Sequence, residues 1–155
     1  MSYRHERYNR SQERDNARVI VDELLSEMTK EIPEWKRLLG ENGLIENLVS
    51  QREFRNLNPT QLRKFFDEVK RVKIKLSESG GWSNEIEPDL WKLVPSIKYA
   101  YGREIVPKSF EYFVSKSVEK ISEISDLKKK EIVFMNFERI FEAIVAYHKY
   151  KHPRG

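Results

Sequence analysis

Apolar residues between Asn58 and Leu76 recur at intervals of three and four, which is the period of an α-helix rather than of a strand. Asn58 precedes Pro59, a start signal in which the asparagine caps the helix and the proline takes its first turn. The segment therefore predicts a long helix with one stripe of side chains for a core. That stripe consists of Leu62, Phe65, Phe66, Val69, Val72 and Leu76.

The other apolar segments show the same helical spacing, and none alternates with the period of two that is typical of a strand. Prolines and glycines separate these segments, as they do at helix ends. The pattern predicts an all-α fold, a single-domain bundle of about five or six helices. Helices are expected from Ala17 to Pro33 with a short continuation at Trp35–Leu39, from Leu44 to Val49, from Pro88 to Gly102 with a restart or kink at Pro95, from Pro107 to Ile121, and from Asp126 to near Pro153, with a loop over Trp82–Glu87.

The first sixteen residues are polar and hold little that a core could bury. We therefore predict a flexible basic arm over residues 1–16 and a helical bundle domain over residues 17–152. Contact with RNA or protein is one way in which such an arm would become ordered. Its cations are Arg4, Arg7, Arg10 and Arg14.

The chain contains no cysteine, which excludes a disulfide framework and any cysteine-ligated zinc or iron–sulfur site. This composition is typical of a reducing cytoplasm. No apolar run reaches the roughly 18 residues that a membrane-spanning helix needs. We expect a soluble, cytoplasmic protein without membrane contact. Because the net charge is only +4, binding to nucleic acid would have to rest on local basic patches.

The predicted helix at 58–76 carries such a patch on the side opposite its apolar stripe. At about 100° per residue, Arg63, Lys64, Lys70 and Arg71 fall on that outer side, with Asp67 among them. A core-packed helix with a cationic outer face is a natural surface for phosphates. The alternative is an ordinary solvated face, in which the neighbouring acids pair with these cations at helical spacing.

Basic and aromatic residues also alternate in two shorter segments. Lys98 to Arg103 holds two cations and two tyrosines without an acid, and Tyr147 to Lys151 repeats the combination. Cations hold phosphates and tyrosines stack on unpaired bases, so both segments are candidates for RNA contact. Tyr101 falls on the apolar stripe and is expected in the core, whereas Tyr99 and Tyr150 are expected to be exposed.

Catalytic and metal-binding patterns are weak. His148 and His152 lie four residues apart beside Pro153, a position expected at a fraying helix end rather than around a metal. No nucleophile has a base at a suitable spacing, and the glycine pairs lack the context of a phosphate loop. We predict no catalytic residue, no metal site and no cofactor.

Three segments in order resemble the small helical subunit of type III-A CRISPR interference complexes. They are Asn-Pro-Thr-Gln-Leu-Arg-Lys-Phe-Phe-Asp-Glu-Val at 58–69, Leu-Val-Pro-Ser-Ile-Lys-Tyr-Ala-Tyr-Gly-Arg at 93–103, and Phe-Glu-Arg-Ile-Phe-Glu-Ala-Ile-Val-Ala-Tyr-His-Lys at 137–149. The resemblance covers roughly residues 44–151 and has no counterpart for the arm or for the loop at 77–89.

The resemblance implies a non-catalytic helical subunit in antiviral defence. Copies would stack head to tail into an inner filament that supports the duplex of CRISPR RNA and target RNA through sequence-independent backbone contacts. Partners would be the backbone and large subunits and further copies of the chain, with a homodimer possible in isolation. The implied RNA-binding residues are Arg63, Lys64, Lys70, Arg71, Lys98 and Arg103, and the implied core residues are Phe65, Phe66, Phe137, Phe141 and Val145.

Two other functions stay open at this stage. A structural helical adaptor would use the same basic face to bind an acidic protein partner rather than RNA. A small RNA-processing enzyme would require turnover that depends on a divalent metal or on histidine, with His148 and Glu142 as the residues to substitute.

Overall fold

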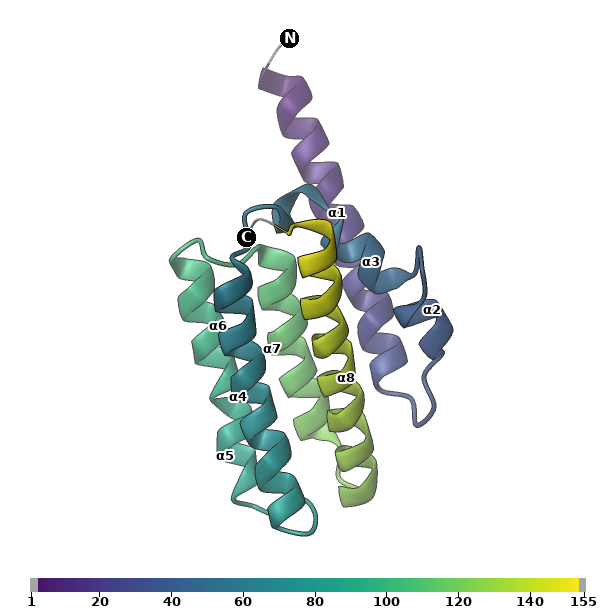
Figure 1. The fold of residues 1–155 in the computed structure, drawn as a ribbon, viewed down its shortest axis with the longest axis vertical. Coiled ribbons are helices and arrows are strands. Elements are labelled where there is room, and N and C mark those ends of the chain that lie inside the picture. The colour runs from purple at the N-terminus through teal and green to yellow at the C-terminus, as the bar shows by residue number, and fades with distance from the viewer. Residues whose placement is uncertain (1–2, 154–155) are drawn as a thin grey trace.

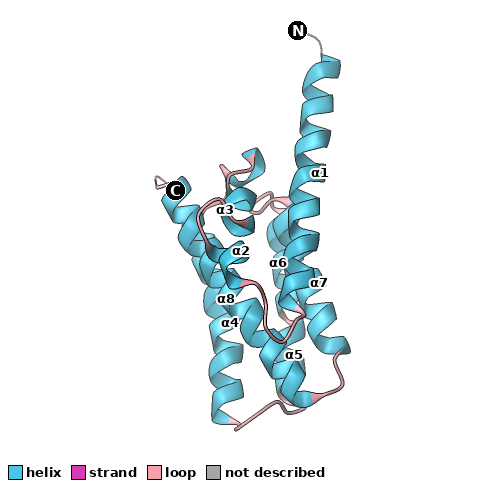
Figure 2. Cartoon of the chain, turned by 90° about the vertical axis from the view of Figure 1, so that its right-hand side faces the viewer, coloured by secondary structure: helices cyan, strands magenta, loops and turns pink. Residues whose placement is uncertain are grey.

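The computed structural model describes the backbone of residues 3–153 and the side chains of residues 16–153. Within residues 3–153 there is no strand, and Figure 2 shows helices and loops alone. The all-α fold is therefore confirmed. The helices are α1 (Tyr3–Met28), α2 (Trp35–Leu39), α3 (Leu44–Val49), the short 3-10 helix η1 (Arg52–Phe54), α4 (Pro59–Glu78), α5 (Ile86–Trp91), α6 (Leu93–Gly102), α7 (Lys108–Glu123) and α8 (Leu127–Lys151). In this part of the chain five α-helices have ten or more residues, in line with the predicted number.

The helices α4, α6, α7 and α8 lie side by side along the long axis of the molecule, as Figure 1 shows. The most extensive helix contacts join α4 to α8 and α6 to α7, while α1 packs against α7 and α3. The short helices α2 and α3 cover the side of α8 that is turned away from α4 (Figures 1 and 2). The helices thus form one bundle around a shared core.

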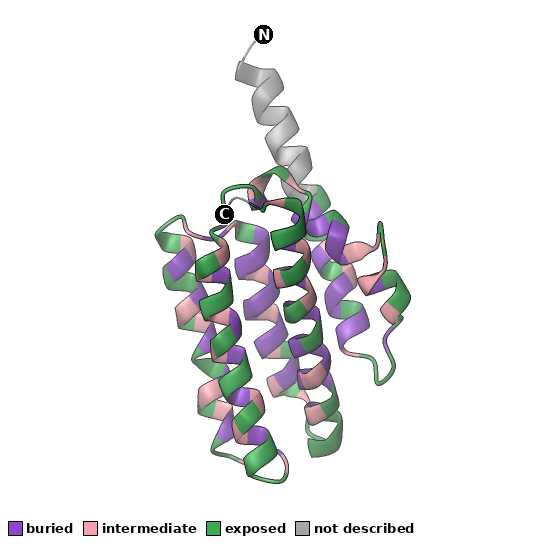
Figure 3. Cartoon of the chain, viewed as in Figure 1, coloured by how far each residue is buried: buried purple, intermediate pink, exposed green. Residues whose placement is uncertain are grey.

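Phenylalanines from three helices make the centre of that core. Phe141 of α8 lies 5.6 Å from Phe66 of α4 and 5.3 Å from Phe110 of α7, measured between ring centroids. One turn earlier, Phe137 lies 5.7 Å from Phe113. Each such pair adds about 0.5–1.5 kcal/mol beyond the burial of its area. Figure 3 shows the buried residues on the inward sides of these helices. The predicted core residues Phe66, Phe137 and Phe141 are buried, whereas Phe65 and Val145 are half-buried.

The predicted cap of α4 is confirmed, and α8 has a cap of the same kind that was not predicted. The Asn58 side chain accepts hydrogen bonds from the backbone N–H groups of Thr60 and Gln61, at 2.8 and 3.3 Å. Asp126 caps α8 in the same way, through Lys128 and Lys129. These bonds satisfy N–H groups that have no partner inside the helix, so both starts are defined by local sequence.

Several helix boundaries differ from the prediction by a few residues. α1 ends at Met28, five residues before Pro33. α5 begins at Ile86, so the predicted loop over Trp82–Glu87 ends earlier than expected. Pro88 lies in the first turn of α5 and Pro95 in the first turn of α6, so neither proline is the first residue of its helix. A proline is tolerated there because first-turn N–H groups need no partner within the helix.

The predicted boundary at residue 16 does not coincide with a break in the backbone, because α1 is continuous from Tyr3 to Met28. From Ala17 onward, α1 contributes buried side chains to the core. The side chains of residues 1–15 lie outside the described residues, so the flexible basic arm stays a prediction.

Candidate nucleic-acid interface

The outer side of α4 carries four exposed cations. Arg63, Lys64, Lys70 and Arg71 are exposed, while Leu62, Phe66, Val69, Val72 and Leu76 of the opposite side are buried. The helical period therefore assigned both faces correctly. We call these four residues the α4 basic strip.

The two remaining basic residues of this helix are turned toward neighbouring helices. Lys73 lies 3.5 Å from the buried carboxylate of Glu138 on α8, and Lys75 lies 2.6 Å from Asp89 on α5. The hydrogen bond to Asp89 raises the pKa of Lys75, and the same bond lowers the pKa of Asp89. These two lysines form contacts between helices and are not part of the strip.

The intrahelical ion pairs that would have neutralised the strip do not form. The carboxylate of Glu68 accepts a hydrogen bond from the Ser96 hydroxyl on α6, at 3.3 Å. Within the described part of the chain, Arg63, Lys64 and Arg71 make no ion pair. The Lys70 ammonium lies 4.7 Å from the centre of the Phe66 ring. The strip therefore presents positive charge to solvent.

Arg103 extends this surface onto α6. It follows Ser96 by seven positions, about two helical turns, so both lie on the side of α6 that faces α4. Its guanidinium lies 5.7 Å from the ring centre of exposed Tyr99. Because α4 and α6 run in opposite directions (Figure 1), the end of α6 lies beside the first turns of α4, which carry Arg63 and Lys64.

Lys98 does not join the other predicted cations. It lies two positions after Ser96, about 200° around the helix, and forms an ion pair with Glu111 of α7. Lys108 binds the same carboxylate at 3.2 Å. Burial alone would raise the pKa of Glu111, but the hydrogen bonds from the two lysines hold that pKa below its ordinary value. The structure thus gives Lys98 an interhelical contact on another side of α6.

Two arginines of this surface were not predicted. Arg52 and Arg55 lie in and just after η1, are exposed, and form no ion pair within the described residues. Their three-residue spacing ahead of the Asn58 cap was the available signal. Without a predicted helix over this segment, the spacing could not be assigned to a face.

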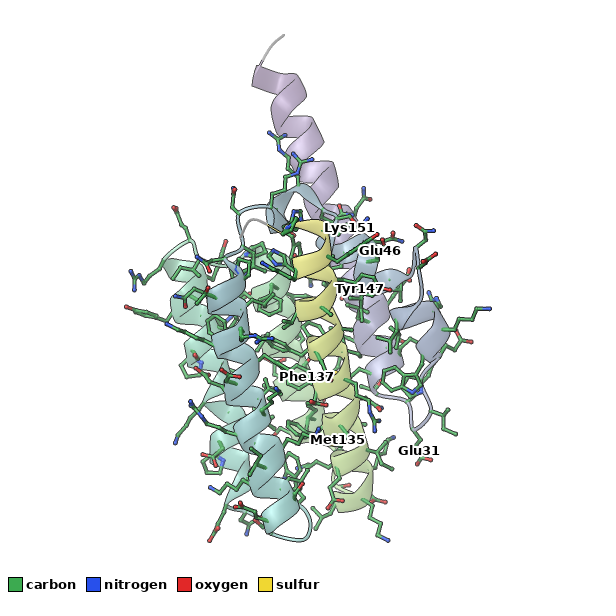
Figure 4. All side chains as sticks on the ribbon, viewed as in Figure 1. Glu31, Glu46, Met135, Phe137, Tyr147 and Lys151 are labelled. Carbon is green, nitrogen blue, oxygen red and sulfur yellow. The ribbon has the colours of Figure 1, made fainter. Side chains whose placement is uncertain are left out.

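The basic and aromatic segment at the end of α8 is used for packing. Lys151 lies 3.0 Å from the carboxylate of Glu46 on α3, and the Tyr147 hydroxyl donates to the carbonyl oxygen of Leu39 at 2.6 Å. Figure 4 shows Lys151, Glu46 and Tyr147 gathered at this end of the bundle. Tyr150 is 72% exposed, as predicted. This segment attaches α8 to α2 and α3.

The two histidines at this end of α8 also form hydrogen bonds, so the prediction that they lie on a fraying helix end is wrong. A ring nitrogen of the fully buried His148 lies 3.0 Å from the Phe54 carbonyl oxygen, and one of His152 lies 3.0 Å from that of Val49. Burial lowers the pKa of His148. Among the described residues no group of three or more histidines and carboxylates is arranged to hold a metal.

Comparison with known proteins identifies the family. The family model described as Csm2 Type III-A matches residues 45–154, which include the strip on α4 and all of α6 and α8. No curated protein and no solved structure matches the chain. Over the described residues, no helix is both long and apolar enough to cross a membrane. Because the match covers more than half of the chain, the protein belongs to the Csm2 family, the small subunit of the type III-A CRISPR effector complex.

Proposed function

We propose that this subunit supports the duplex of CRISPR RNA and target RNA through contacts to the phosphate backbone, without catalysis of its own. The observation that carries the proposal is the exposed positive charge of the α4 basic strip, which forms no ion pair with the described residues and is continued by Arg103 at the end of α6. A subunit that serves any target must ignore base edges, and exposed cations on rigid helices grip phosphates without reading sequence.

The proposal includes assembly. Copies of the subunit stack head to tail beside the backbone and large subunits, which requires two different patches on each copy to meet. In isolation the same surfaces would allow a homodimer. We also expect the subunit to work in the cytoplasm, as a part of an RNA-guided antiviral complex.

Salt dependence provides a quantitative test. Each phosphate that a cation neutralises contributes roughly 0.7–0.9 to the slope of log affinity against log salt concentration. Replacing Arg63 and Lys64 by glutamine should therefore weaken RNA binding about equally for all sequences and reduce that slope by about 1.5. Fluorescence anisotropy with labelled RNA duplexes between 50 and 200 mM salt would measure both quantities.

A matched control comes from the opposite end of the bundle. Lys128 and Lys129 are exposed in the first turn of α8, and their glutamine variant changes the net charge by the same amount. We expect this variant to bind RNA like the unmodified protein, apart from a small general effect of charge. Equal loss in both double variants would show that RNA binding reflects net charge and not the strip.

The alternative partner is an acidic protein, and one residue favours it. Ile74 lies among the exposed residues of α4 and is 55% exposed, and an apolar side chain beside cations suits a protein interface. Affinity purification from the native cell, with and without nuclease, separates the two functions. Co-purification of CRISPR RNA with a repeating backbone subunit supports the proposal, whereas capture of an acidic protein that survives nuclease favours the adaptor.

A further inference from the structure

A hollow of about 660 Å³ lies between the segment around η1 and the turn that joins α6 to α7. Its apolar wall includes Leu57 and Val106, which are 2% and 6% exposed, and the half-buried ring of Tyr101. Polar side chains at its edge include Arg52, Glu104 and Lys108. The volume lies within the roughly 300–1,000 Å³ of small-ligand sites, and an apolar wall with a few polar groups is their usual composition. We call it the α6–α7 hollow.

The backbone of the turn holds Glu104 in an unfavourable conformation. Its φ is +61°, in the left-handed region where glycine is normally found. The N–H of Glu104 donates to the Tyr101 carbonyl and that of Ile105 to the Ala100 carbonyl, both at 2.9 Å. This bond pattern is the Schellman motif, whose left-handed position most often carries glycine. A carboxylate is thus kept at the edge of the hollow at a cost in backbone energy, as happens at binding sites.

The hollow opens onto the cationic surface. Arg52 and Gly102 line it, Arg55 lies three residues after Arg52, and Arg103 follows Gly102. Further along the chain from the lining residue Leu57, the first turns of α4 carry Arg63 and Lys64. An RNA strand whose phosphates contact Arg52, which lines the hollow, and Arg103, which follows the lining residue Gly102, would run beside the opening.

The charged groups of the hollow favour a base inside it rather than a phosphate. Glu104 at its edge disfavours a phosphate within, and the Lys108 ammonium is already bound to Glu111 at 3.2 Å. An aromatic heterocycle with an amino group suits the interior better, because it packs on apolar walls and donates to a carboxylate. A nucleobase has both properties, whereas its phosphate suits the arginines at the opening, among them the lining residue Arg52.

We infer that the α6–α7 hollow binds the base of one unpaired RNA nucleotide whose flanking phosphates lie on the arginines around its opening. This inference rests on the proposed function, because it places the RNA strand on the same cationic surface. It adds a contact that a fully paired duplex does not make. The duplex contacts stay independent of sequence, and only the unpaired base gains a preference: cytosine, adenine and guanine have exocyclic amino groups that can donate to Glu104, whereas uracil has none.

Gly102 allows the hollow to be filled without disturbing the fold. It is exposed, a β-carbon added there would meet nothing within 4 Å, and its φ lies outside the left-handed range. Gly102→Phe places a ring at the opening, and Gly102→Ala is the matched control that adds only a methyl group. Both variants should show the helical circular dichroism and cooperative melting of the unmodified protein.

The assay compares labelled 12-nucleotide single-stranded RNA with a blunt 12-base-pair duplex on the full chain. Loss of one stacked base should lower single-strand affinity roughly fivefold to a hundredfold in Gly102→Phe and leave its duplex affinity unchanged. Gly102→Ala should bind both RNAs like the unmodified protein. Equal single-strand affinity of the two variants, or an equal loss on the duplex, would overturn the inference.

A second variant tests the same inference without added bulk. Glu104→Gln keeps the turn and removes the carboxylate, so it should lower the ratio of oligo(C) to oligo(U) affinity; an unchanged ratio would count against the base-binding role. The Arg63→Gln, Lys64→Gln variant separates this question from the proposed function. Unchanged duplex affinity in that variant would refute the proposed role of the α4 basic strip. Unchanged single-strand affinity in Gly102→Phe would refute only the base-binding role of the hollow.

Discussion

The stability of the bundle should depend on pH through His148. The imidazole is fully buried, and its Nε2 lies 3.0 Å from the Phe54 carbonyl oxygen. A carbonyl only accepts, so Nε2 carries the proton in the neutral ring and Nδ1 does not. Nδ1 is buried and has no hydrogen-bond partner among the described residues, so a proton placed there would stay unsolvated. Burial, together with the charges of His152 and Lys149, lowers the pKa of His148 below 6.5.

The sign of the effect follows from proton binding. Below pH 6.5 the unfolded chain takes up a proton on His148 and the folded chain does not, so the free energy of unfolding falls as pH falls. The contribution is fully present above pH 6.5 and is lost by at most about 1.4 kcal/mol per pH unit below it. The effect ends once the pH passes the folded pKa.

His148→Phe isolates this contribution. The phenyl ring fills the site but leaves the Phe54 carbonyl without its donor, which should cost about 1–3 kcal/mol at pH 7.5. The stability difference between the two proteins should then shrink by up to about 1.4 kcal/mol at pH 5.5, where few carboxylates titrate. Urea denaturation followed by circular dichroism at several pH values would measure it, with His152→Gln as the control. Parallel pH profiles of the unmodified protein and His148→Phe would refute the reasoning.

Two further outcomes follow from the packing. Glu111→Gln removes the carboxylate that Lys98 and Lys108 share, so it should lower the free energy of unfolding. Because the pKa of Glu111 is lowered in the folded protein, the stabilisation by this carboxylate is present above pH 4.5 and is lost below it. Thermal melts at pH 7 and pH 4 would check this, and an unchanged difference between the two proteins would contradict it. Phe137→Ala should cost about 3–5 kcal/mol in chemical denaturation, because the ring is fully buried among three other phenylalanines. Phe65→Ala, at a half-buried position, should lower the free energy of unfolding clearly less. Equal losses in the two variants would show that the contacts among the buried phenylalanines add no extra stability.

The features that could be predicted from the sequence depend on residues within the same helical turn or the same helix. Asn58 and Asp126 cap helices because their side-chain oxygens accept hydrogen bonds from N–H groups two or three residues further along the chain. The buried and exposed sides of α4 follow from the period of the helix, so the strip was assigned without tertiary information. The resemblance that led to the family lies in the same segments, and the match over residues 45–154 bears it out.

The sequence by itself thus determined the helices, their inward faces and the family, because each depends on neighbours along the chain. Only the tertiary structure decided which cations of the described residues form ion pairs with another helix. Lys73 is neutralised by Glu138, 65 residues away, and Lys98 by Glu111 on the next helix. The same packing placed Arg52 beside the turn after Gly102 and created the hollow between them. Periodicity tells which way a side chain points, but its partner depends on which helix packs there and in what register.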